Sequence, residues 1–171
     1  MPDSYDNVVC ENCPYHPQGK LFCGIEGLPL NAELNGSRIL LVLQSPGIVE
    51  WHERRPLANL ENGAGRRFTE SLGRIGLCRN NFDITNAIQC YQGKGLNKRD
   101  KRPSIVARRC CSVWLEQTIN GTQYDRILVF GAVAKASIAD LHLPENIQII
   151  YLAHPSGGLA NESLDEALRP A

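Results

Sequence analysis

The sequence predicts an α/β protein, a three-layer α/β/α sandwich with a central, mainly parallel sheet of four strands. Short apolar runs alternate along the chain with longer segments of helical periodicity. The runs lack polar alternation, which is typical of strands covered on both faces. With 171 residues, of which 43% are apolar and 21% charged, we expect residues 1–171 to form a single domain.

The first strand is expected at residues 39–43, directly before the turn Gln44-Ser45-Pro46-Gly47. Residues 51–62 are polar and irregular, and a loop of this length often carries function. The other strands are predicted at residues 82–90, 126–130 and 147–152. Helices are predicted at residues 65–77, 105–119, 132–141 and 162–168.

Charge and hydropathy exclude some partners and leave others open. No apolar stretch reaches the 18 residues of a membrane span, and residues 1–6 lack an apolar leader segment. We therefore expect no membrane partner and a cytoplasmic protein, nucleoid-associated if the source is bacterial or archaeal. The 18 basic and 18 acidic residues cancel overall, but residues 91–109 hold seven basic side chains against Asp100 alone.

Polar side chains follow three of the predicted strands. Gln44, Asn86 and His154 each stand at or just beyond a strand end. Because the carboxyl ends of parallel strands meet at one edge of a sheet, we expect these side chains to face a single pocket. Each alone has a simpler explanation as a loop residue that satisfies backbone groups.

The seven cysteines of a cytoplasmic chain do not predict disulfides. Cys10 and Cys13 form a CxxC pair, Cys90 follows the second predicted strand, and Cys110 and Cys111 are adjacent on a predicted helix. Four thiolates from these three segments could hold a [4Fe–4S] cluster, and a structural zinc ion is the alternative. The remaining two, Cys23 and Cys78, are interpreted as buried thiols.

Taken in order, the motifs of the chain resemble those of one enzyme family. They are Cys10-Glu11-Asn12-Cys13-Pro14, Pro46-Gly47 with Glu50, Arg55-Pro56, Thr85-Asn86 with Cys90, a helix-borne cysteine, Gly131 with Ala134, and His154-Pro155-Ser156. This order, from residue 10 to about 159, resembles the iron–sulfur, family 4-like branch of the uracil-DNA glycosylase superfamily. The resemblance implies a monomeric enzyme of DNA base-excision repair, which flips uracil, or a related deaminated base, out of DNA and hydrolyses its N-glycosidic bond.

The resemblance also implies roles for individual residues. The cluster ligands become Cys10, Cys13, Cys90 and Cys111, the last because the family's ligand lies four residues before a helix leucine, as Cys111 does before Leu115. The cluster is expected to be structural.

In the pocket, Asn86 resembles the family's uracil reader, since a carboxamide offers a donor for O4 and an acceptor for N3–H. His154 resembles the histidine that stabilises charge at O2 of the leaving base. Glu50 is expected near C5, where it would crowd a thymine methyl group. The turn residues Ser45, Pro46 and Gly47 complete the substrate contacts.

Two pocket positions depart from the family pattern. Gln44 stands where the family has an acidic residue, and an amide can position a water molecule but cannot act as a general base. Leu57 stands where the family has a phenylalanine that stacks on the base. Three hypotheses therefore stay open: uracil release, release of another deaminated base such as hypoxanthine or xanthine, and DNA or damage binding without catalysis.

Contacts to DNA are expected from two segments. A solvated loop would also explain the basic stretch, but beside the Asn86 strand end we expect phosphate contacts. The residues concerned are Lys94, Lys98, Arg99, Lys101 and Arg102. Residues 156–159 resemble the family's minor-groove loop, with Ser156 as a DNA contact and Leu159 as a wedge.

Overall fold

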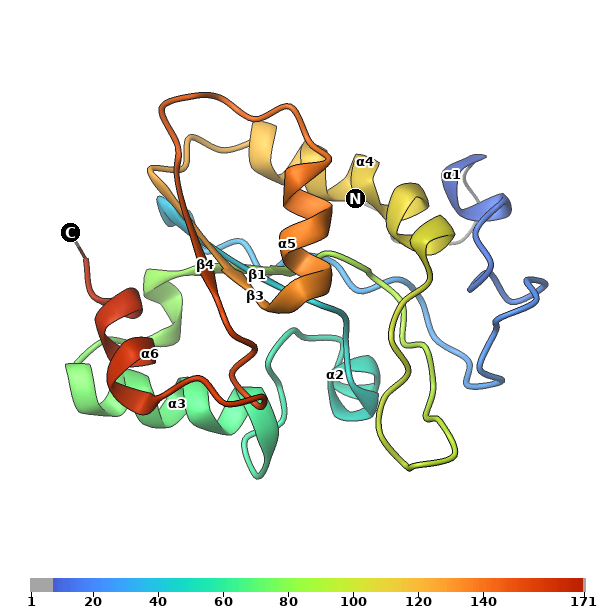
Figure 1. Ribbon diagram of the computed structural model, residues 1–171, viewed down its shortest axis with the longest axis horizontal. Coiled ribbons are helices and arrows are strands. Elements are labelled where there is room, and N and C mark those ends of the chain that lie inside the picture. Colours follow the sequence, from blue (N-terminus) through green and yellow to red (C-terminus); the bar gives the residue numbers. More distant parts are fainter. Residues whose placement is uncertain (1–7, 171) are drawn as a thin grey trace.

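The computed structural model describes residues 8–170, and within them one four-stranded sheet lies between two layers of helices (Figure 1). All strand pairs are parallel and their order is β2-β1-β3-β4, which confirms the predicted fold class. The strands are β1 (Ile39–Leu43), β2 (Asp83–Asn86), β3 (Arg126–Phe130) and β4 (Gln148–Leu152).

The helices flank this sheet in the order expected for alternating strands and helices. None of those within residues 8–170 is long and apolar enough to cross a membrane. They are α1 (Val8–Glu11), α2 (Ile48–Glu53), α3 (Gly63–Ile75), the 3₁₀ turn η1 (Arg79–Asn81), α4 (Ile105–Asn120), α5 (Gly131–Ala139) and α6 (Asn161–Leu168).

The central strand β1 builds the core on both sides. Leu41 and Leu43 belong to one buried cluster with side chains of α3 and α6. Leu40 and Val42 point the other way and pack with side chains of α4 and α5. Successive side chains of a strand alternate between faces, so a run of apolar residues buries both faces of the sheet at once. Figure 1 accordingly shows α3 and α6 on one side of the sheet and α4 and α5 on the other.

Two local predictions were wrong. The strand predicted over residues 82–90 ends at Asn86, because the chain then bends across the end of β1. There the N–H groups of Ala87 and Ile88 donate to the carbonyls of Leu43 and Gln44, at 2.8 and 3.0 Å. The loop predicted over residues 51–62 is shorter, since its first residues belong to helix α2.

The strand order creates a crevice at one edge of the sheet. Strand β1 lies between β2 and β3. The chain leaves β1 toward the α3 layer and leaves β3 directly into α5, on the opposite face. Loops that diverge in this way open a gap outside the carboxyl ends of the strands, which is where open α/β sheets bind ligands.

Candidate functional site

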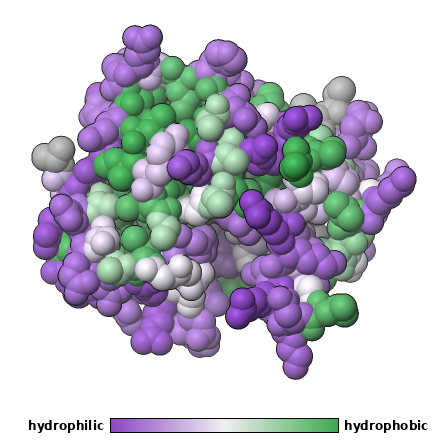
Figure 2. Space-filling view, viewed as in Figure 1, coloured by the Kyte–Doolittle hydropathy of each residue, from purple (hydrophilic) through white to green (hydrophobic). Residues whose placement is uncertain are grey.

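A pocket of about 690 Å³ lies at this edge of the sheet. Figure 2 shows the surface hollowed there, with hydrophilic residues along one side of the hollow. Most of the residues predicted for the site line this pocket, although they come from five separate segments. Those that do are Gln44, Ser45, Gly47, Glu50, Leu57, Asn86, Lys94, Arg99, His154 and Ser156.

The remaining predicted residues lie apart from the pocket wall. Pro46 is buried beside it, whereas Lys98, Lys101 and Arg102 are exposed on the neighbouring loop. The side chain of Leu159 is only 8% exposed and packs in the α3–α6 core. Its expected role as a wedge stays a prediction, and this burial does not support it.

Asn86 is placed by the sheet itself. It pairs in register with Leu43, the last residue of β1. Its carbonyl accepts from Nε2 of Gln89 at 2.9 Å, which fixes the bend after β2. The residue is 4% exposed, and within residues 8–170 no protein group hydrogen-bonds its carboxamide. The side chain lines the pocket, so its amide is available to a ligand that supplies both an acceptor and a donor.

His154 follows β4 and is held from two sides. Its ring packs on Gly131, where an added Cβ would lie 3.3 Å from the Cβ of His154 and 3.6 Å from Cδ2. Gly131 has a φ of +86°, a backbone conformation that favours glycine, and a side chain at this position would also crowd the His154 ring. The start of α5 therefore requires glycine. The N–H of Gly157 donates to the His154 carbonyl at 2.8 Å and closes the turn.

The contacts of the His154 ring determine which nitrogen carries the proton. Nδ1 accepts from the Ser156 N–H at 3.3 Å and lies 2.7 Å from Ser156 Oγ. Because a backbone N–H can only donate, we assign the proton of the neutral ring to Nε2, and Ser156 Oγ then donates to Nδ1. Burial lowers the pKa of His154 below 6.5, so the ring is neutral at neutral pH. His154 can therefore present an Nε2–H donor to a ligand.

Arg67, on α3, fastens the loop that carries His154. Its guanidinium donates to the carbonyls of Pro155 and Leu159, and to Oδ1 of Asn161 at 2.8 Å. Arg67 could not be identified from the sequence. It contacts a residue 88 positions away, and the local spacing of residues does not indicate such a contact. Arg67 holds the loop in one arrangement and thereby limits where the imidazole can lie.

Two carboxylates face the pocket near Gly47. A Cβ added to Gly47 would meet Oε2 of Glu50 at 2.7 Å and Oδ2 of Asp100 at 3.5 Å. The other oxygen of Glu50 accepts from the N–H of Asn59 at 3.0 Å, which ties α2 to the following loop. Asp100, which sequence analysis had counted only as a charge, thus lines the same pocket as Gln44. Its neighbour Tyr91 has a raised pKa, owing first to burial and then to the Asp100 charge.

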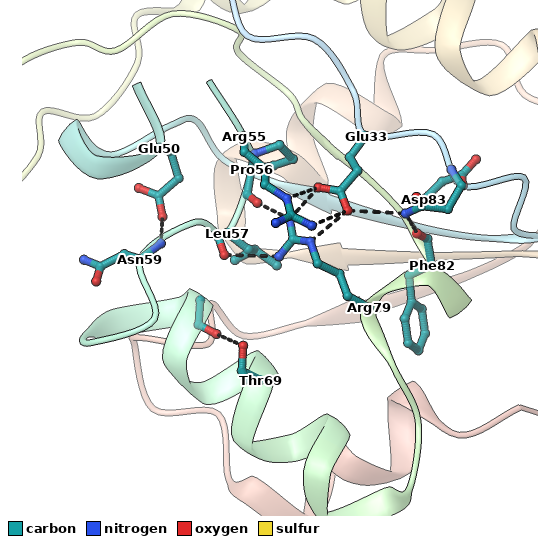
Figure 3. Close-up of polar contacts among 12 residues, drawn as sticks. Glu33, Glu50, Arg55, Pro56, Leu57, Asn59, Thr69, Arg79, Phe82 and Asp83 are labelled. Atoms are coloured by element: carbon teal, nitrogen blue, oxygen red, sulfur yellow. Dashed lines mark hydrogen bonds and ion pairs between the residues drawn. The ribbon is translucent and has the colours of Figure 1, made fainter. Parts of the chain in front are cut away.

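A network around Glu33 supports the pocket wall at Leu57 (Figure 3). Glu33 binds Arg79 through two contacts of 2.8 and 2.7 Å, and Arg55 at 2.8 Å. Arg79 also donates to the carbonyls of Pro56 and Leu57. The φ of Leu57 is +51°, a conformation that a leucine adopts only when its surroundings hold it there. The network therefore fixes the part of the loop that faces the pocket.

We expect the Glu33→Gln variant to lose about 3 kcal/mol of unfolding free energy at pH 7. Burial would raise the pKa of Glu33, but hydrogen bonds from Arg79 and Arg55 outweigh it and lower the pKa to about 2, from 4.5 in an unfolded chain. The contribution is complete above pH 4.5 and is lost as the pH falls toward 2. Urea unfolding at pH 7, and at pH values from 4.5 down to 2, measures this contribution to the free energy of unfolding. The exposed Glu53→Gln variant is the control, and equal losses in both variants would contradict the assignment.

Buried thiols gather at the end of the molecule next to α1 and α4. Four cysteines are 5–7% exposed: Cys10, Cys13, Cys90 and Cys111. Three of these form one cluster with Tyr15 and Trp51. Of the two adjacent cysteines on α4, Cys111 is the more buried, and its side chain interacts electrostatically with all three of the others. Cys110 is half-buried and contacts Cys13.

Burial makes two of these thiols, Cys13 and Cys111, weaker acids. It raises the pKa of Cys13 to about 11 and raises the pKa of Cys111 well above its ordinary value, with the charges of neighbouring cysteines adding to both. Within residues 8–170, no group of three or more His, Cys, Asp or Glu side chains is arranged to hold a metal ion directly. Cys23 is half-buried and is not one of the four buried cysteines. Cys78, expected to be buried, is exposed at the start of η1.

Two comparisons with known proteins indicate the family of this chain. A family model described as "Uracil DNA glycosylase superfamily" matches residues 32–170. A curated relative from Pyrobaculum aerophilum, named type-4 uracil-DNA glycosylase, is 27% identical over 132 residues, which make up 77% of this chain. The aligned part spans 60% of that relative's length. Cys10 and Cys13 lie before the match to the family model, whereas Asn86, His154 and Cys111 lie within it.

Proposed function

The chain belongs to the uracil DNA glycosylase superfamily, and on this premise we propose that it hydrolyses the N-glycosidic bond of uracil in DNA. The observation that carries the proposal is the convergence of Asn86 and His154 on one pocket. Asn86 offers an amide on the pocket lining that makes no side-chain hydrogen bond within residues 8–170, and His154 offers an Nε2–H donor held by Ser156. A flipped uracil presents matching groups, O4 and N3–H on one edge and O2 on the other.

The reaction needs charge stabilisation more than proton transfer. As the bond between C1′ and N1 breaks, its electron pair leaves with the base, which becomes an anion with charge on O2. The Nε2–H of His154 donates to that oxygen, and a donor already in place costs no reorganisation. A water molecule then forms a bond to C1′ of the cationic sugar and releases its proton to solvent. Gln44 orients this water from the end of β1.

Specificity follows from the same contacts. Cytosine has an amino group where uracil has O4, so it cannot make the same pair of hydrogen bonds with Asn86. The Glu50 side chain, held by the Asn59 N–H, is expected beside C5 and excludes the methyl group of thymine. Leu57 supplies an apolar wall but no aromatic ring.

The negative charge opposite the sugar would come from Asp100 or Glu50, the carboxylates that line the pocket within residues 8–170.

We propose that Cys10, Cys13, Cys90 and Cys111 hold a [4Fe–4S] cluster. The donor set fits this group, since all four thiols are buried and Cys13, Cys90 and Cys111 lie in one apolar cluster. Four thiolates are the usual ligands of such a cluster, and these four cysteines would supply them. When bound, the cluster supplies a cross-link between α1, α4 and the segment after β2. Zinc in the same place is the alternative.

For the cofactor, we expect the Cys111→Ala variant to lose iron and the visible iron–sulfur absorbance, whereas Cys110→Ala and Cys23→Ala keep both. The reason is that Cys111 is buried in one cluster with Cys13 and Cys90, whereas Cys110 is half-buried and only packs against that cluster. Metal and sulfide analysis of anaerobically purified protein measures this result. Loss of iron only in Cys110→Ala would reverse the choice of ligand. Zinc without sulfide in the unmodified protein would establish the alternative.

A second function is favoured by one observation. Gln44 removes the acidic residue that the family resemblance implies for catalysis. A protein with this change could bind damaged DNA without cleaving it, or release another deaminated base. Hypoxanthine and xanthine carry the same pair of a carbonyl oxygen and an N–H on a larger ring system, so Asn86 alone does not exclude them.

The experiment that separates these functions uses five duplexes that differ at one base: uracil, hypoxanthine, xanthine, thymine or cytosine. With enzyme in excess, abasic sites are revealed as strand breaks after alkali. We expect cleavage at uracil and none at thymine or cytosine. Cleavage at hypoxanthine or xanthine instead would show a different substrate. Tight binding without any cleavage would support the non-catalytic function.

A further inference from the structure

Residues 94–100 form a closed hairpin at the rim of the pocket. Lys94 and Asp100 pair as an antiparallel bridge and also form an ion pair at 3.6 Å. Inside the turn, the Gly95 N–H donates to the Arg99 carbonyl at 2.8 Å, and the Lys98 N–H donates to the Gly95 carbonyl at 3.0 Å. These bonds give the tip one defined shape.

The hairpin holds a leucine out into solvent. Leu96 has a relative exposure of 108%, against 61% for Ile105, the next most exposed large apolar residue within residues 8–170. Single exposed leucines are common, but they usually rest against the surface. This one touches none of the core clusters and stands at the tip of a hydrogen-bonded turn. A rigid turn that displays an apolar side chain is suited to insertion into a partner.

Cations flank this leucine along the same hairpin, and two of them line the pocket. Lys94 and Arg99 line the pocket, and Lys98 is exposed beside them. An apolar tip among cations matches a partner with apolar interior layers and an anionic outside. Stacked bases between phosphate backbones have this composition, and apolar side chains are known to enter such stacks.

We propose that Leu96 enters the base stack at the position that the flipped nucleotide leaves, while Lys94, Lys98 and Arg99 contact the flanking phosphates. This inference rests on the proposed function, because it needs a nucleotide in the pocket. It also assigns the wedge to a different loop from the one that the family resemblance indicated. Leu159 is packed in the core and its loop is fastened by Arg67, whereas Leu96 is already in the open.

The test compares Leu96→Ser with a matched control, Leu34→Ser. Leu34 is also an exposed leucine, at 53%, but it lies outside the pocket lining. Uracil release under single-turnover conditions is measured on duplex and on single-stranded DNA. We expect Leu96→Ser to lower the duplex rate by about 10- to 100-fold, from the lost burial of one leucine side chain. Its single-strand rate should be unchanged, since no stack has to be held open, and Leu96→Phe should retain the duplex rate.

A second readout separates this inference from the proposed function. Duplexes with 2-aminopurine next to the uracil become fluorescent when the stack opens, whether or not the base is released. If the unmodified protein opens the stack but frees no uracil, the proposed function fails, and a smaller fluorescence rise for Leu96→Ser still supports the wedge. Equal fluorescence and equal duplex rates for Leu96→Ser and the unmodified protein would overturn the inference that Leu96 enters the base stack. Thermal unfolding of the two should coincide, because Leu96 is fully exposed.

Discussion

Replacing His154 by alanine is expected to slow uracil release by about 100- to 1,000-fold under single-turnover conditions, which corresponds to about 3 kcal/mol of lost transition-state stabilisation. The loss arises because the Nε2–H donor faces charge that develops only as the glycosidic bond breaks. Affinity for uracil-containing DNA should change little, since the same oxygen is nearly neutral in the bound substrate.

The pH dependence of the unmodified protein tests the same assignment. Burial lowers the pKa of His154 below 6.5, so the neutral ring prevails above that pH. We expect no change in rate from His154 ionisation between pH 7 and 9.

For the His154→Ala measurement, the exposed His142→Ala variant is the control for loss of a histidine elsewhere. A rate for His154→Ala within twofold of the unmodified protein would contradict the role of the ring.

Replacing Asn86 by leucine is expected to slow uracil release by about two to four orders of magnitude. The leucine is of similar size, so the pocket keeps its shape while both hydrogen bonds to the uracil edge are lost. Each unpaired buried group costs about 1–3 kcal/mol. The loss should appear as weaker binding of the flipped base as well as slower release, because Asn86 contacts the base before and during bond breakage.

The exposed Asn80→Leu variant is the matched control for the Asn86 measurement, since it makes the same change outside the pocket. Asn86 is 4% exposed at the end of β2, so thermal unfolding of both variants has to be compared first. If Asn86→Leu folds normally and still prefers uracil to cytosine, the base is recognised by other groups.

The sequence was sufficient for the architecture and for the main pocket residues. Continuous apolar runs predict buried parallel strands, and polar residues at their carboxyl ends must then share one edge of the sheet. This reasoning placed Gln44, Asn86 and His154 in one pocket, as observed. It failed at the end of β2, because Ala87 and Ile88 look like strand residues. Their burial is instead due to a bend across β1.

Other parts of the site depend on contacts between distant segments. Glu33 reaches Arg79 across 46 residues, and Arg67 reaches the His154 loop across 88. A charged residue that will form a buried pair looks, in sequence, like one that will lie in solvent. The same limit applies to Asp100, which appeared to be one acid in a basic stretch but lies against Gly47 in the pocket.

The burial of Leu159 and the exposure of Leu96 illustrate this limit for apolar residues. Both are single leucines in glycine-containing loops. Which of them packs in the core depends on whether a helix face lies within reach. Leu159 packs against α3 and α6, whereas the hairpin holds Leu96 away from the core.

The most direct test of the account is the release of free uracil by the unmodified protein, measured by mass spectrometry on a duplex with a single uracil and enzyme in excess. We expect one equivalent of free uracil and one abasic site for each duplex, even with glutamine at position 44. A duplex that stays intact while bound to the protein would contradict it, and would show that the pocket of Asn86 and His154 recognises the base without releasing it.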